Sequence, residues 1–318
     1  MHEQRPPLSI RLRNGLVARN RVWLAPLTNQ QSHDDGVLST AEQRWLERRA
    51  EGGFGVVETC AAHVSQDGQG FDGQLGVWGD HQLPRLRELA AAIAQAGALG
   101  LVQLYHGGVR SPSRLTGRRP WSASSFTEAG RPDFEVPRAA EVSDIEAAID
   151  AFEQAARRTA AAGFHGVELH GAHGYLLGQF LSGTMNQRTD EWGGSFANRA
   201  RLIRTIARRV RAATPAEFLV GARISLKTSA TPAASTSTNR CSSPPGWPRT
   251  ASTSSTSRCG TARRTPPSAP TSTPSRCSAP PCRSTSRSSS PATSGPAPRP
   301  RPSSSAAPTS SLSARLRS

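Results

Sequence analysis

Two histidines and a tyrosine interrupt an apolar stretch in the middle of the chain, within "VELHGAHGYLLGQF". The residues are His170, His173 and Tyr175. Their imidazole and phenol groups can donate hydrogen bonds and can transfer protons. The run before them is short, continuous and apolar, which is typical of a strand buried on both faces. A buried strand is therefore predicted to end directly at a group of donors.

Four other short apolar runs have the same character, and helix-like segments separate them. The five runs end near Pro26, Cys60, His106, Gly171 and Ser225. The spacing of Ser39 to Glu42 and of Ser143 to Glu146 is that of a capping box before a helix, and two more helices are expected over 83–96 and 198–213. Such repeats predict parallel strands joined by helical crossovers. We predict an α/β fold, an incomplete (β/α)8 TIM barrel made of its first five βα units.

Polar residues stand at the ends of all five predicted strands, where α/β barrels carry their chemistry. They are Pro26-Leu27-Thr28, Glu58-Thr59, Gln103 with His106, His170 with His173 and Tyr175, and Arg223. The set contains donors, aromatic rings and one guanidinium, but no paired carboxylates, no nucleophile with a base and no metal-ligand cluster. No metal site is predicted. Residues 109–138, rich in Pro, Arg and Ser, are expected to form a long excursion over the face of this site.

The chain joins two different compositions near Ser225. Residues 226–318 contain one Lys, twelve Arg and no acidic residue, so they contribute +13 of the formal charge of +16. Their few large apolar side chains cannot offset a backbone entropy cost of about 1–2 kcal/mol per residue. We predict a barrel region over 1–225 and a disordered Arg/Ser/Pro/Thr-rich tail over 226–318.

The remaining signals favour a cytoplasmic protein without a membrane segment. No signal peptide is recognised, and no apolar run approaches the roughly 20 residues that span a bilayer. Four of the five cysteines lie in the tail, without the histidines or CxxC pairs of a metal site.

Four segments, in this order, resemble the Old Yellow Enzyme family of FMN-dependent ene-reductases, also called NADH:flavin oxidoreductases. They are "NRVWLAPLT", "QLYHGG", "HGAHGYLLGQFLSGTMNQRTDEWGGSFANRARL" and "VGARIS". The resemblance covers about residues 8 to 225. It implies that NADH or NADPH reduces a bound FMN, which passes hydride to the activated C=C bond of a small-molecule substrate.

The resemblance also implies roles for individual residues. His170 and His173 match the pair that holds the substrate oxygen, and Tyr175 matches the proton donor. Flavin contacts are implied at Pro26, Leu27, Thr28, Thr59, Gln103 and Arg223, with Arg223 near the ring atoms that gain negative charge on reduction. His106 is expected to be structural.

The resemblance stops after Ser225, where family members continue with three more strands that grip the FMN phosphate. Codons can be chosen for parts of the tail so that an offset frame encodes acidic and apolar residues, and we hypothesise that the reading frame was lost there. Two alternatives to an active ene-reductase follow: an inactive, truncated or frameshifted product, and a protein whose basic tail binds polyanions. The tail's spread charges and single aromatic residue argue against specific nucleic-acid recognition.

Overall fold

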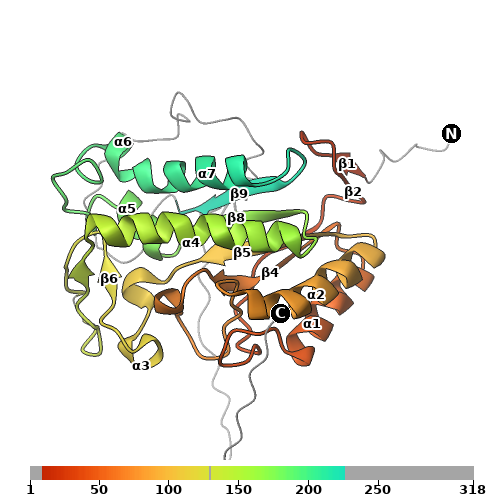
Figure 1. The fold of residues 1–318 in the computed structure, drawn as a ribbon, viewed down its shortest axis with the longest axis horizontal. Coiled ribbons are helices and arrows are strands. Elements are labelled where there is room, and N and C mark those ends of the chain that lie inside the picture. The colour runs from red at the N-terminus through yellow and green to blue at the C-terminus, as the bar shows by residue number, and fades with distance from the viewer. Residues whose placement is uncertain (1–8, 129, 226–318) are drawn as a thin grey trace, which may run out of the picture. The chain divides into compact units, whose positions relative to one another are not determined.

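A five-stranded parallel sheet runs through the part of the chain that the structure, a computed structural model, describes (Figure 1). The described residues are 9–128 and 130–225, and the predictions for 226–318 lie outside them. The strands are β3 (Trp23–Leu24), β4 (Val56–His63), β5 (Leu99–Tyr105), β8 (Gly166–Gly171) and β9 (Leu219–Ile224). Each pairs in parallel with the strand before it, so the order in the sheet is the order in the chain. The five predicted strands are confirmed, and the first four are each followed by the expected helix; the residues after β9 lie outside the described part of the chain.

Four longer helices cover one face of this sheet and connect its strands (Figure 1). They are α1 (Thr40–Glu51), α2 (Leu83–Gln95), α4 (Val142–Ala161) and α7 (Arg201–Ala213). Neighbouring helices pack in chain order, α1 on α2, α2 on α4 and α4 on α7. This is the arrangement of a curved sheet with an outer layer of helices, as in part of a barrel.

The starts of α1 and α4 differ in how well the sequence predicts them. The Ser39 hydroxyl caps α1, accepting a hydrogen bond from the backbone N–H of Glu42 at 3.1 Å, as expected. The predicted cap at Ser143 is wrong, because α4 already begins at Val142. There the Asp144 carboxylate accepts from the backbone N–H of Glu141 at 2.8 Å, so Asp144 takes the role that the predicted capping box gave to Glu146.

The main core lies between the sheet and the helices. Its fully buried side chains include Leu46, Leu89, Ile93, Phe152, Leu169 and Ile206. A smaller apolar cluster lies on the opposite, concave face and contains Ala18, Val56, Leu99 and Leu101. The hairpin of β1 (Ile10–Arg11) and β2 (Val17–Ala18) adds to that cluster. Both faces of the central strands are therefore buried, which explains their continuous apolar runs.

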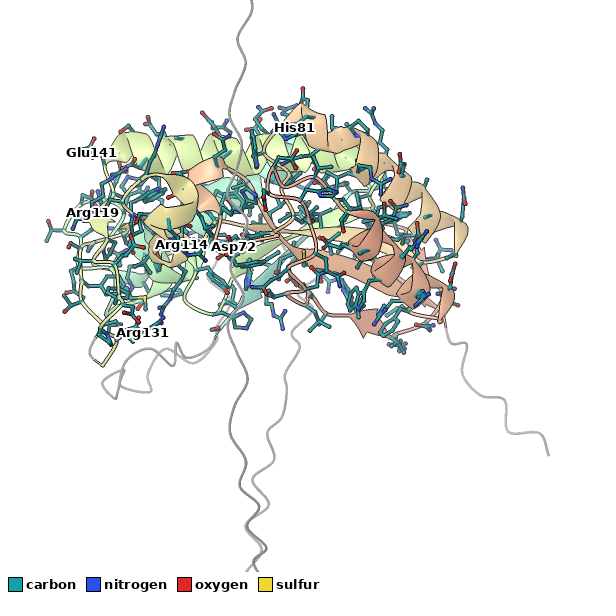
Figure 2. The ribbon with its side chains drawn as sticks, turned by 90° about the horizontal axis from the view of Figure 1, so that it is seen from below. Asp72, His81, Arg114, Arg119, Arg131 and Glu141 are labelled. Carbon is teal, nitrogen blue, oxygen red and sulfur yellow. The ribbon has the colours of Figure 1, made fainter. Side chains whose placement is uncertain are left out.

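Short elements fill the carboxyl edge of the sheet. Residues 109–138 carry the end of η3 (Gly108–Arg110), α3 (Ser113–Thr116), β6 (Trp121–Ser122) and the first residue of β7 (Arg138–Ala139). The indole N–H of Trp121 donates to Asp67 at 2.9 Å, in η1 (Gln66–Gly68). On the surface, Arg114 of α3 makes a bidentate pair with Asp72, and the two residues lie side by side in Figure 2. The excursion is thus tied to the loops that follow β4.

Three further elements complete the fold: η2 (Asp80–Gln82), α5 (Leu176–Leu181) and α6 (Phe196–Arg199). The helix expected over 198–213 is divided, because α6 ends before Ala200 and α7 begins after it. Within 9–128 and 130–225, no helix combines the length and apolarity required to cross a bilayer.

Candidate active site

A cavity of about 100 Å³ opens where the five strands end. Its lining residues are Pro26, Thr28, Ala61, Gln103, His170, His173, Tyr175 and Arg223. Seven of these residues belong to the set singled out from the sequence, and they come from the ends of four different strands. The parallel sheet explains the convergence, because the carboxyl ends of all its strands meet at one edge.

The spacing of His170, His173 and Tyr175 is produced by a tight turn after β8. His173 and Gly174 both have positive φ values, 57° and 75°, and the Tyr175 N–H donates to the Ala172 carbonyl at 3.3 Å. Positive φ at both central positions is the signature of a type I′ turn. The His173 N–H also donates to the Ser225 hydroxyl at 3.0 Å, which ties the turn to the end of β9.

The turn brings three rings together. The ring centroids of His170 and His173 are 5.1 Å apart, and those of His170 and Tyr175 are 4.9 Å apart. His170 is 4% exposed, and its Nδ1 atom has no hydrogen-bond partner within the described residues. The cavity therefore holds a buried polar atom whose partner is not supplied by this part of the protein.

Both imidazoles are held in the neutral form. Burial, followed by the charges of His173 and Arg223, lowers the pKa of His170 from 6.5 to about 3. Burial and then Arg223 also lower the pKa of His173. Near neutral pH each ring is therefore uncharged, and each keeps one N–H that can donate to a ligand oxygen.

Gln103 and Arg223 form the other side of the cavity. The Gln103 side chain is 1% exposed and donates through Nε2 to the Glu168 carboxylate at 2.7 Å. The Arg223 guanidinium forms no hydrogen bond or ion pair with any residue that the structure describes. A guanidinium without a hydrogen-bond partner among the described residues, beside an amide, suits a ligand with electron-rich oxygen or nitrogen atoms.

Two predicted contact residues are placed differently. The expectation that Thr59 stands at a strand end is wrong, because β4 continues to His63. Its hydroxyl donates to the Cys60 carbonyl at 2.8 Å, and Ala61 lines the cavity instead. A bulge between Glu58 and Ala61 shifts the pairing of β4 with β5, and this shift brings Ala61 rather than Thr59 to the cavity. Leu27 is 52% exposed and does not line the cavity, although both its neighbours do.

A further residue near the site does not stand at a strand end, so the search of predicted strand ends did not identify it. Gln179 of α5 is fully buried, and its amide nitrogen donates to the carbonyls of Gly107 and Gly174 at 2.9 and 2.8 Å. It therefore fastens the histidine turn to the loop after β5. Its only sequence signal is a polar residue inside an apolar helix. His106 does not line the cavity, and it contacts Trp121 and Asp67 instead.

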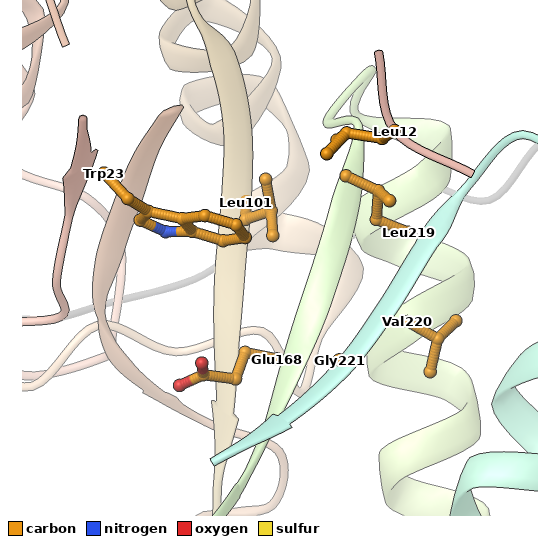
Figure 3. A pocket seen from close by; sticks show the side chains of 7 residues that line it. All are labelled: Leu12, Trp23, Leu101, Glu168, Leu219, Val220 and Gly221. Atoms are coloured by element: carbon orange, nitrogen blue, oxygen red, sulfur yellow. The ribbon is translucent and has the colours of Figure 1, made fainter. Parts of the chain in front are cut away.

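A second, smaller hollow of about 30 Å³ lies deeper on the concave face (Figure 3). Its lining residues are Leu12, Trp23, Leu101, Glu168, Leu219, Val220 and Gly221. Glu168 is the one acidic residue among them, and Figure 3 shows its side chain projecting from β8. The same carboxylate receives the hydrogen bond from Gln103, so Glu168 lies between the apolar hollow and the polar cavity.

A curved parallel sheet with outer helices and a polar cavity at its carboxyl edge defines an α/β-barrel protein with a ligand site at the mouth. The chain belongs to the NADH:flavin oxidoreductase / NADH oxidase family, whose model matches residues 8–241. The predicted resemblance is thereby confirmed. The match extends past the predicted limit of 225, into residues that the structure does not describe.

The relatives agree with this assignment. A probable NADH-dependent flavin oxidoreductase, YqiG of Bacillus subtilis, is 38% identical over 225 residues, which are 69% of this chain and 59% of the relative. An NADPH dehydrogenase of Bacillus licheniformis is 36% identical over 193 residues, 60% of this chain and 56% of the relative. The chain thus spans less than two thirds of the length of these relatives.

Solved structures confirm the fold class. The Old Yellow Enzyme homologue from Zymomonas mobilis superposes with a TM-score of 0.62 at 33% identity, covering 68% of this chain and 63% of its own. Morphinone reductase in complex with tetrahydroNAD gives a TM-score of 0.63 at 30% identity, covering 69% and 64%. The five strands described here are therefore part of a TIM-barrel arrangement.

Proposed function

We propose that the cavity binds FMN and that the chain is an ene-reductase using NADH or NADPH. Its substrate would be the activated C=C bond of an α,β-unsaturated carbonyl or a related compound. The observation that carries the proposal is the convergence of Pro26, Thr28, Gln103, His170, His173, Tyr175 and Arg223 on one cavity. A small soluble reductant and substrate are consistent with a cytoplasmic location, which is part of the same proposal.

The residues present fit a flavin. When bound, FMN supplies a carrier that accepts hydride from a nicotinamide and donates it to an alkene. Gln103 would meet the polar edge of the ring, and the Arg223 guanidinium would lie where negative charge gathers on reduction. Pro26 and Thr28 would lie beside the ring, and the exposed Leu27 side chain offers apolar surface next to them.

The two histidines would hold the substrate oxygen. Hydride addition to the β-carbon moves negative charge onto the carbonyl or nitro oxygen, and preorganised donors stabilise that charge. His170 and His173 are 5.1 Å apart between ring centroids, with their planes at 90°. Because both imidazoles are neutral, each would donate a single N–H without placing a full cation beside Arg223.

Tyr175 would deliver a proton to the α-carbon. Its ring centroid lies 4.9 Å from that of His170 and 6.3 Å from that of His173, so a substrate held by the histidines comes within its reach. The phenol is partly exposed, so it can regain its proton from water. Together the three residues hold the oxygen and protonate the carbon of one small molecule.

The visible absorbance spectrum of the purified 318-residue chain, recorded after incubation with FMN and desalting, tests the proposal first. A retained flavin band supports it, and reduction of cyclohexenone by NADH and by NADPH is then measured. A colourless protein overturns it and favours the alternative, a chain without the phosphate-binding strands that no longer holds flavin.

A further inference from the structure

A buried carboxylate lies directly behind the cavity and contacts one of its lining residues. Glu168 is opposite Gln103 in the pairing of β5 with β8, and its Oε1 atom accepts from Gln103 Nε2 at 2.7 Å. An ionised carboxylate can only accept hydrogen bonds. The Gln103 amide must therefore turn its nitrogen to Glu168, which leaves its carbonyl oxygen for a partner elsewhere. Within the described residues, the Gln103 side chain has no other hydrogen bond.

A second buried carboxyl group, Glu58, lies near Glu168 and competes with it for the negative charge. Glu58 is 2% exposed and accepts from the Trp23 indole at 3.1 Å, while its Oε1 atom has no partner among the described residues. Burial and then the charge of Glu168 raise the pKa of Glu58 well above its ordinary value, although the Trp23 bond and the charge of Arg223 act against this. Burial also raises the pKa of Glu168, but the bond from Gln103 and the charge of Arg223 act against this. The pKa of Glu58 is thus the more strongly raised of the two, so Glu168 is the member of the pair that ionises more readily.

Arg223 lies on the same side of the sheet as Glu168. Arg223 pairs with His170 in the register of β8 and β9, and Gly221 pairs with Glu168. Residues two apart on a strand face the same side. The Arg223 guanidinium at the cavity therefore has the Glu168 carboxylate on the same side of the sheet, two residues further from the strand ends. The cavity consequently presents a hydrogen-bond acceptor, the Gln103 oxygen, near a cation.

We propose that Glu168 is a positioning residue: its carboxylate fixes the Gln103 amide so that the carbonyl oxygen faces the ligand and selects a ring edge bearing an N–H. The inference rests on the proposed function, because the imide edge of a flavin is such an edge. A neutral side chain at position 168 would allow the amide to turn and present its NH₂ group instead, which would repel that N–H.

The selection can be measured with FMN and FMN methylated at ring atom N3, using quenching of flavin fluorescence to obtain both Kd values. Methylation removes the N–H, and we expect it to weaken binding to the unmodified chain by about tenfold, the value of one hydrogen bond. Glu168→Gln is expected to reduce that ratio by at least about threefold. Glu58→Gln is the matched control, since Glu58 is a buried carboxyl group that bonds Trp23 and not Gln103, and it should leave the ratio unchanged. An unchanged ratio in Glu168→Gln overturns the proposal.

Failure of the proposed function gives a different result, namely no FMN binding by the unmodified chain. The positioning role is then tested without a ligand, from the side-chain amide protons of Gln103 in ¹⁵N-labelled protein, assigned by their loss in Gln103→Glu. One proton should resonate downfield because it is bonded to a carboxylate, and it should move upfield in Glu168→Gln but not in Glu58→Gln. Glu168→Asp, which retains the charge, should preserve the downfield signal. Identical spectra for Glu168→Gln and the unmodified chain overturn the proposal.

Discussion

The ring of Tyr105 packs edge to face against that of Tyr175, with centroids 4.5 Å apart and an interplanar angle of 68°. Tyr105 is the last residue of β5 and is 1% exposed. Burial raises the pKa of Tyr105 well above its ordinary value, and the neighbouring Tyr175 raises it further. A buried, protonated phenol thus supports the phenol that we propose as the proton donor, and it comes from the strand that carries the proposed flavin contact Gln103.

Tyr175→Phe should impair proton delivery and leave flavin reduction nearly intact. The variant keeps the ring packed on Tyr105 but removes the acidic proton. General acid catalysis contributes about 10²–10⁴-fold, so the step that reduces cyclohexenone should slow by about 10²-fold or more. Stopped-flow absorbance separates this step from reduction by NADPH. Equal slowing of both steps would contradict the proton-donor role.

Replacing both His170 and His173 with alanine should abolish turnover while FMN stays bound. Removal of one such donor costs about 10²–10³-fold in rate, so loss of both should leave activity near background. The spectrum after desalting reports the flavin, and NADPH consumption with cyclohexenone reports turnover. His81→Ala, at an exposed histidine labelled in Figure 2, is the control and should behave as the unmodified chain. Full activity of the double variant would refute the donor assignment.

Acid should destabilise the protein through His170. The unfolded chain binds a proton at this residue near pH 6.5, whereas the folded chain binds it only near pH 3. Between these values the unfolded state holds more protons, so stability is full above the upper value and is lost as the pH falls. The loss is at most about 1.4 kcal/mol per pH unit. Urea unfolding of the unmodified chain and of His170→Asn should show a shallower acid dependence in the variant; parallel curves would exclude this contribution.

A side chain at Gly174, in the type I′ turn after β8, should lower the stability of the protein. A Cβ atom there meets nothing within 4 Å, so Gly174→Ala is opposed by its φ of 75° alone, at about 1 kcal/mol. Gly117→Ala, with a φ of 67° and equally open surroundings away from the cavity, is the matched control. Both should lower the free energy of unfolding alike, but only Gly174→Ala should also reduce activity. Unaltered activity in Gly174→Ala would separate this turn from the site.

The true start of α4 can be checked by two serine substitutions. Ser39→Ala removes a real cap from α1 and should cost about 1 kcal/mol of stability. Ser143→Ala changes an exposed residue inside α4 and should alter stability by less than about 0.5 kcal/mol. Chemical unfolding measures both. Equal losses would mean that Ser143 also contributes to the start of its helix.

The sequence by itself determined the order of the five strands and the groups at most of their ends. Apolar runs buried on both faces are visible as continuous stretches, and a parallel sheet necessarily gathers their carboxyl ends. That is why the sequence alone assigns His170, Gln103 and Arg223, which are far apart in the chain, to one site. The sequence also predicted that His173 and Tyr175 lie beside His170, because the turn that sets their spacing is formed by neighbouring residues.

Tertiary structure decided what depends on contacts between strands. The bulge in β4 puts Ala61 rather than Thr59 at the cavity, because pairing register is a property of two strands and not of one. The bonds from Gln103 to Glu168 and from Gln179 to Gly174 join side chains that have no sequence signature of their own. The surroundings also raise the pKa of Glu58 more strongly than that of Glu168, although both are glutamates, because the free energy of a charge depends on its environment.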